Sequence, residues 1–128
     1  MRNGSVKTLL QVNVLDLGFP HGKTLSDPEL TTYADRYLLE YLGGIERRRT
    51  GYSASPVAHI RLAGMPAARA TWGGAVGGRD VVGVMYSVIV RNRYAVILHT
   101  QDLGREPTAG MFEAMRSIES LTLADEPD

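Results

Sequence analysis

The segment that most restricts the fold of this chain is the pair of apolar runs on either side of Asn92. Asp80 to Val90 is rich in Val, Ile and Tyr, which are among the residues most frequent in β-strands. Tyr94 to Thr100 is a second apolar run, and Asn92 between them tolerates the positive φ of a tight turn. The pattern predicts an antiparallel hairpin formed by two consecutive strands.

Helical periodicity is found on both sides of this hairpin. Ser26 and Glu29 have the spacing of a capping box, and Pro28 suits a first helical turn. Apolar residues then recur at helical spacing as far as Tyr41, and the pair Gly43-Gly44 predicts the helix end. A second helix is predicted from Pro107 onward, with an apolar stripe that consists of Met111, Phe112, Met115 and Ile118.

Shorter runs predict the remaining strands. Lys7 to Leu15 alternates, and the side chains that share its apolar face, which we expect to be buried, are Leu10, Val12 and Val14. Three further strands are predicted, at Ile45–Ser53, Val57–Leu62 and Ala67–Trp72. The last of them is followed by a predicted flexible connection, Gly73–Gly78. Leu121–Leu123 alternates briefly and is a candidate for a last short strand.

These elements predict an α+β fold in which an antiparallel β-sheet is flanked by two α-helices. A length of 128 residues is enough for one core, and no repeat or linker divides the chain. We therefore expect one domain over residues 1–128, with flexible ends at residues 1–6 and 124–128.

Composition excludes several classes of function. The chain has no cysteine, which excludes disulfides, thiolate metal sites and a cysteine nucleophile. Its formal net charge is zero, so nucleic acid is not an expected partner. No apolar run approaches the length of a membrane span or of a signal peptide. We expect no membrane insertion and a cytoplasmic location.

Two patterns resemble binding or catalytic motifs but do not satisfy them. Gly18 to Thr24 lies between a strand and a helix, as a phosphate-binding loop does, but its glycines are too close and Pro20 removes a backbone donor. The three histidines are His21, His59 and His99, and none has a second histidine at ligand spacing. We predict no catalytic residues, no metal and no cofactor.

Arg47 and Arg49 belong to a run of three arginines. Within the predicted strand at residues 45–53 these two would share one face. The simpler interpretation is a solvated strand whose charges discourage edge pairing. The alternative is a docking patch for an acidic partner.

The segment from His59 to Leu123 resembles the C-terminal half of PsbP-like domains. The resemblance rests on Leu62–Arg69, the long hairpin at Val81–Thr100, the Met111–Met115 helix and the Ile118–Leu123 segment. It implies an α/β/α sandwich without shared catalytic residues. Members of the family include an extrinsic photosystem II protein, a Ran-binding import factor and bacterial lipoproteins. Members usually have a further N-terminal hairpin before the strand matched here by Leu9 to Leu15, and we expect this chain to lack it.

These observations leave three candidate functions for the chain. The favoured one is a non-enzymatic protein-interaction or accessory module, whose partner is another protein or a second copy bound at the sheet edge through Leu10, Val12 and Val14. The missing hairpin and the zero net charge favour a homodimer.

The alternative is a carrier of a small apolar ligand, with a pocket between helix and sheet. The candidate wall residues of this pocket are Tyr37, Tyr41, Trp72, Tyr86 and Phe112. A third alternative is an enzyme built on this scaffold.

Overall fold

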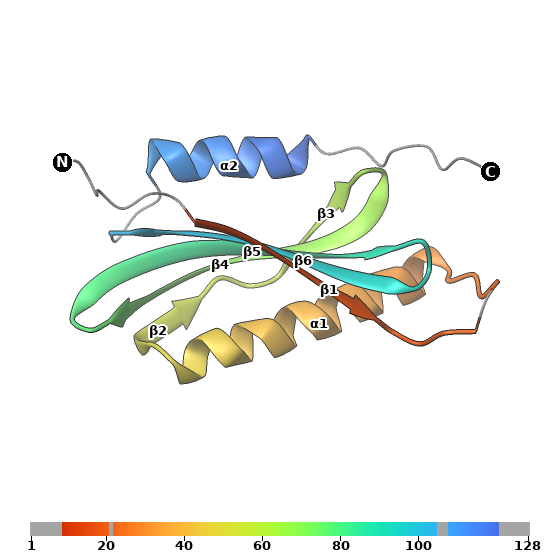
Figure 1. Cartoon of the computed structure of the whole chain (residues 1–128), viewed down its shortest axis with the longest axis horizontal. Helices are drawn as coiled ribbons and strands as arrows, with labels where there is room; N and C mark the ends of the chain where they lie inside the picture. Colours follow the sequence, from red (N-terminus) through yellow and green to blue (C-terminus); the bar gives the residue numbers. More distant parts are fainter. Residues whose placement is uncertain (1–8, 21, 105–107, 121–128) are drawn as a thin grey trace.

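The described part of the chain forms one antiparallel sheet with a helix on each face (Figure 1). The computed structural model describes residues 9–20, 22–104 and 108–120. Within these residues the strand order is β1-β6-β5-β4-β2, and β3 also pairs with β4. The elements are β1 (Leu9–Asp16), α1 (Asp27–Arg47), β2 (Thr50–Ala54), β3 (Ala58–Leu62), β4 (Met65–Val76), β5 (Arg79–Val90), β6 (Tyr94–Leu103) and α2 (Ala109–Glu119). The predicted α+β class is confirmed.

The predicted hairpin is the centre of this sheet. β5 and β6 pair in register from Val81–Leu103 to Val90–Tyr94, and β4 continues the sheet on the other side of β5. Asn92 has a φ of 57°, as its place in the turn predicted. Because cross-strand neighbours point to the same side, every position on these strands can be assigned to one of two faces.

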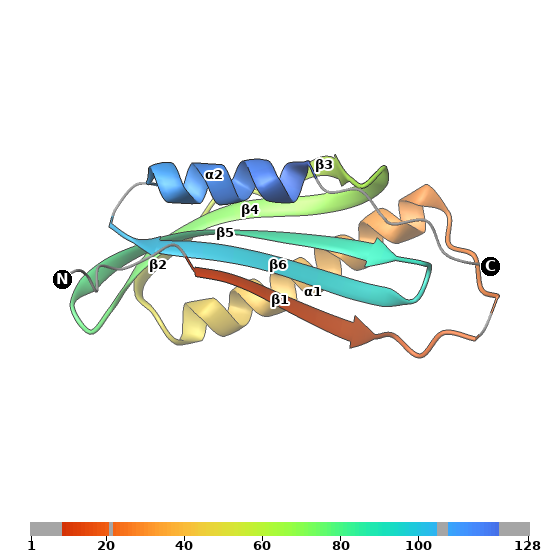
Figure 2. The same cartoon turned by 45° about the horizontal axis from the view of Figure 1, so that its top comes forward.

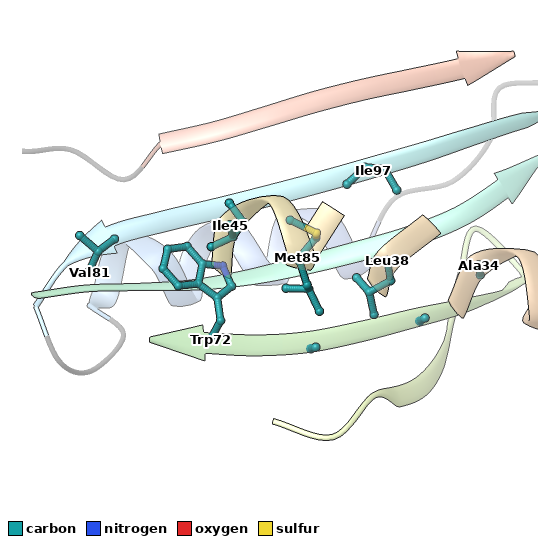
Figure 3. Close-up of a cluster of buried hydrophobic side chains, with 10 residues drawn as sticks. Ala34, Leu38, Ile45, Trp72, Val81, Met85 and Ile97 are labelled. Carbon is teal, nitrogen blue, oxygen red and sulfur yellow. The ribbon is translucent and has the colours of Figure 1, made fainter. Parts of the chain in front are cut away.

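Helix α1 covers one face, which we call the α1 face. Its buried residues Leu38, Leu42 and Ile45 pack on Trp72 and Met85, among others (Figure 3). The predicted capping box is present, since the Ser26 N–H donates to Glu29 Oε1 at 3.0 Å and the Glu29 N–H donates to Ser26 Oγ at 3.3 Å.

The predicted end of this helix was wrong. Helix α1 passes through Gly43 and Gly44 and ends at Arg47, so Ile45 is a helical residue and not the start of a strand. The helical pattern of buried residues explains the difference, because continuing the helix brings Ile45 into the core beside Leu42. The predicted strand at 45–53 is reduced to β2, which begins at Thr50.

Helix α2 covers the opposite face, the α2 face. Met111 and Ile118 are buried against Val84, Tyr86 and Leu98. The predicted stripe was wrong at Phe112, which is exposed, because this residue lies 100° around the helix from Met111. Pro107 and Leu121–Leu123 lie outside the described residues, as do the two predicted flexible ends.

Two strand boundaries also differ from the prediction. β4 continues through Gly73 and Gly74 as far as Val76, so only Gly77-Gly78 forms the connection that was expected over residues 73–78. Pairing with β5 on one side and β2 on the other holds these glycines in the sheet. β6 likewise extends past Thr100 to Leu103.

Candidate interaction surface

β1 forms one edge of the sheet (Figure 2). It pairs with β6 through all of its eight residues, and no other strand of the described chain pairs with its outer side. The Leu17 N–H, one residue beyond β1, donates to the Arg93 carbonyl at 2.9 Å. Backbone groups alternate in direction along a strand, so the odd-numbered residues bond β6. The N–H and C=O groups of Leu10, Val12 and Val14 therefore point outward from the sheet.

The side chains of these three residues form an exposed apolar stripe, which we call the β1 stripe. Leu10, Val12 and Val14 are 49%, 55% and 61% exposed. The predicted burial of this face was wrong. The stripe lies on the α2 face, because Val12 is opposite Leu98 in β6, but α2 packs against β6 and β3 and does not cover the edge strand.

An ion pair fixes the C-terminal end of β1. Arg93 donates from Nε and Nη2 to the two carboxylate oxygens of Asp16, at 2.9 and 2.8 Å. These bonds, with a further one from the Gly18 N–H, lower the pKa of Asp16 to about 2. Asp16 is thus engaged inside its own molecule, and the strand preceding it has no charged residue between Leu9 and Leu15.

The opposite edge of the sheet is built differently. β2 and β3 are five residues each and lie one after the other along β4, with a register irregularity between Thr50 and Ser53. Two residues of β3 have polar contacts with α1: His59 Nε2 lies 3.0 Å from the Asp35 carboxylate, and Arg61 forms an ion pair with Asp27 at 3.2 Å. Short strands, irregularities and charges protect an edge against further pairing. β1 is longer and has none of these features along its centre.

The two candidate arginines do not share a strand face. Arg47 is the exposed last residue of α1, and Arg49 lies in the connection to β2. The guanidinium carbon of Arg49 is 5.2 Å from the centre of the Trp72 ring, and burial, followed by the charge of Arg48, lowers the pKa of Arg49. No described carboxylate forms an ion pair with Arg47 or Arg49. The structure thus gives Arg49 a packing role over the core that its sequence context does not indicate.

The five candidate wall residues do not surround one pocket. Tyr37, Tyr41 and Trp72 belong to the cluster on the α1 face, and Tyr86 belongs to the cluster on the α2 face. Phe112 is exposed on α2. A hollow of about 620 Å³ lies between the first turns of α1 and β3, and none of the five lines it.

Sequence reasoning missed a buried polar pair on the α1 face. Trp72 lies across Gly83, and its Nε1 donates to Nε2 of His99 at 3.0 Å. His99 is 4% exposed, and burial, followed by the charges of Arg49 and Arg48, lowers its pKa to about 4. This imidazole is neutral at pH 7 and enclosed by protein. The absent side chain of Gly83, opposite Trp72 in register, is the one signal that could have indicated the pair.

The described residues contain no cluster of three or more His, Cys, Asp or Glu side chains that could hold a metal ion. Of the two described helices, neither combines the length and the hydropathy needed to cross a membrane.

Comparison with known proteins identifies the fold alone. No known family model and no curated protein matches the chain. Its structure is similar to that of PA94, a Pseudomonas aeruginosa protein of unknown function, with a TM-score of 0.53 and 15% sequence identity over 91% of this chain and 85% of that one.

Proposed function

We propose that this chain is a non-enzymatic protein-interaction module that accepts an extended segment of its partner at the β1 edge. The observation that carries the proposal is the coincidence, at Leu10, Val12 and Val14, of exposed apolar side chains with outward backbone groups that no described strand pairs. Strand addition uses both features, since the backbone bonds provide affinity and alternate side chains provide specificity. The contrast with the protected β2–β3 edge supports the choice of this edge.

The carrier function is less well supported. Trp72 and Tyr86 are buried in core clusters on opposite faces of the sheet, so these two side chains cannot form the walls of one pocket. A cytoplasmic location and kinship with PsbP-like domains remain part of the proposal. The position of the two helices on opposite faces of one antiparallel sheet supports that kinship.

The test uses an eight-residue peptide with the sequence of Leu9–Asp16 as a probe for strand addition. The labelled chain is held at nanomolar concentration, and the peptide is titrated to high micromolar concentration. We expect saturable binding that Val12→Pro abolishes, because proline removes an outward N–H donor without removing one that bonds β6.

Val12→Thr is the matched control, because it keeps both the N–H and a β-branched side chain, and it should bind as the wild type does. If Val12→Pro fails to fold, Val12→Lys replaces it, since a charge in the β1 stripe should also prevent pairing. Absence of saturable binding, or equal binding by the Pro, Lys and Thr variants, would contradict the proposed function.

A further inference from the structure

We propose that the segment bound at the β1 edge is β1 of a second copy of this chain, paired antiparallel about a two-fold axis at Val12. This inference rests on the proposed function and names its partner. A two-fold dimer is the commonest closed assembly, and it requires a surface that is complementary to itself. The β1 edge meets this requirement in both its backbone and its side chains.

The backbone groups set which registers are allowed. The outward groups belong to the even-numbered residues, so an even-numbered residue of one copy must face an even-numbered residue of the other. With the axis at Val12, this residue faces itself and Leu10 faces Val14 of the second copy. Each such pair exchanges two hydrogen bonds, so the segment from Leu10 to Val14 contributes about six across the axis.

The side chains select one of these registers. With the axis at Val12, each of the three apolar residues of the β1 stripe has an apolar partner. On the other face, Gln11 lies opposite Asn13 of the second copy, so one side-chain amide meets another. Moving the axis to Asn13 would set Leu10 against Asp16, and moving it to Gln11 would set Val14 against a residue beyond the stripe.

Electrostatics do not oppose this pairing. The strand has no charge between Leu9 and Leu15, Asp16 is held by Arg93, and the chain has a formal net charge of zero. The two-fold axis is perpendicular to the sheet, so both α2 helices lie on the same face. The two β1 stripes join into one apolar strip between them, which extends the hydrophobic surface shared by the copies.

Molar mass in solution is the first measurement. Light scattering coupled to size exclusion should give twice the chain mass of 14.0 kDa for the wild type and for Val12→Thr. Val12→Pro and Val12→Lys should each give a monomer with unchanged circular dichroism.

Cysteine cross-linking tests the register, because the chain contains no cysteine of its own. In Val12→Cys the two Cα atoms across the axis would lie about 5.5 Å apart, within disulfide reach. In Val14→Cys they would be roughly 14 Å apart, which is four residue steps along the strand. We expect Val12→Cys to cross-link on oxidation, and Val14→Cys and Leu10→Cys to cross-link only when mixed with each other.

The outcomes separate this inference from the function on which it rests. A wild-type monomer at every concentration would overturn pairing with a second copy, and if the peptide still binds at the edge, the proposed function stands. A dimer in which Val14→Cys cross-links by itself as readily as Val12→Cys would overturn the register. A dimer that persists in both Val12→Pro and Val12→Lys would overturn the use of this edge.

Discussion

The buried His99 makes the stability of the core depend on pH. Its pKa is lowered from 6.5 to about 4 in the folded chain, whereas an unfolded histidine titrates near 6.5. Between these values the unfolded state binds a proton that the native state does not, so the free energy of unfolding falls as pH decreases. At 1.4 kcal/mol per pKa unit, the loss between pH 7 and pH 4 is about 3 kcal/mol.

Urea denaturation at pH 7 and at pH 4 measures this loss. His99→Gln should lose less stability on acidification than the wild type does. Asp16 titrates in a separate window, because its contribution is present above about pH 4 and is lost as pH falls toward 2. Equal acid sensitivity of the wild type and His99→Gln would show that His99 is not the responsible group.

Gly83 is required by the close approach of Trp72. A Cβ at Gly83 would lie 2.5 Å from the indole ring, which must then shift away from His99. We expect Gly83→Ala to destabilise the fold by roughly 1–3 kcal/mol, as overpacking does. Because Trp72 is the single tryptophan, a change in the native fluorescence emission should accompany the loss of stability.

Gly73→Ala is the control, since its added Cβ would meet nothing nearer than the Val81 carbonyl at 4.0 Å. If Gly83→Ala melts as Gly73→Ala does, the indole is not confined as described.

At the scale of the element, the length of α1 predicts that one glycine substitution increases stability, whereas Gly83→Ala decreases it. Gly43 is inside the helix, and its added Cβ would approach only the flexible end of Arg47, at 3.7 Å. Gly43→Ala should therefore stabilise the chain by about 0.5–1 kcal/mol, because glycine is a poor helix former. Gly77→Ala, in the β4–β5 turn at a φ of 57°, should destabilise it. Thermal melts of both variants measure these changes in stability. Destabilisation by Gly43→Ala would indicate that the helix ends at the glycine pair.

The C-terminal end of α2 is held by a polar contact of its own. Tyr86 donates to Glu119 Oε2 at 2.5 Å, and Arg69 donates to the same oxygen at 2.8 Å. Burial, followed by the Glu119 carboxylate, raises the pKa of Tyr86. Helix α2 is thereby joined to β4 and β5 at one end, in addition to its apolar contacts with the α2 face.

At the scale of the molecule, the core clusters on the two faces share one sheet, so damage to one face should unfold the whole chain. Val84 is fully buried on the α2 face. Val84→Asp would bury an unpaired carboxylate, which costs several kcal/mol against a total stability of typically about 5–15 kcal/mol. We expect loss of the cooperative melt and of native circular dichroism. Val76→Asp, at a position 45% exposed, should melt close to the wild type. An unchanged melting temperature for Val84→Asp would contradict the assigned core.

Sequence patterns were sufficient to predict the elements that depend on contacts between residues close together in the chain. The β5–β6 hairpin is determined by adjacent apolar runs and the turn residue Asn92, and the start of α1 by Ser26 and Glu29, three positions apart. The sequence by itself therefore determined the fold class and the location of the central strands.

Tertiary structure decided the rest, because the deciding contacts join residues far apart in sequence. Helix α1 continues past its glycines because the core accepts Ile45. His99 is neutral at pH 7 because the fold buries it and brings the charges of Arg49 and Arg48 near it, which lowers its pKa. Alternation in β1 shows that Leu10, Val12 and Val14 share a face, but not whether anything covers that face. Their exposure follows from the edge position of β1 and from the placement of α2 over β6 and β3, and neither is encoded within the strand.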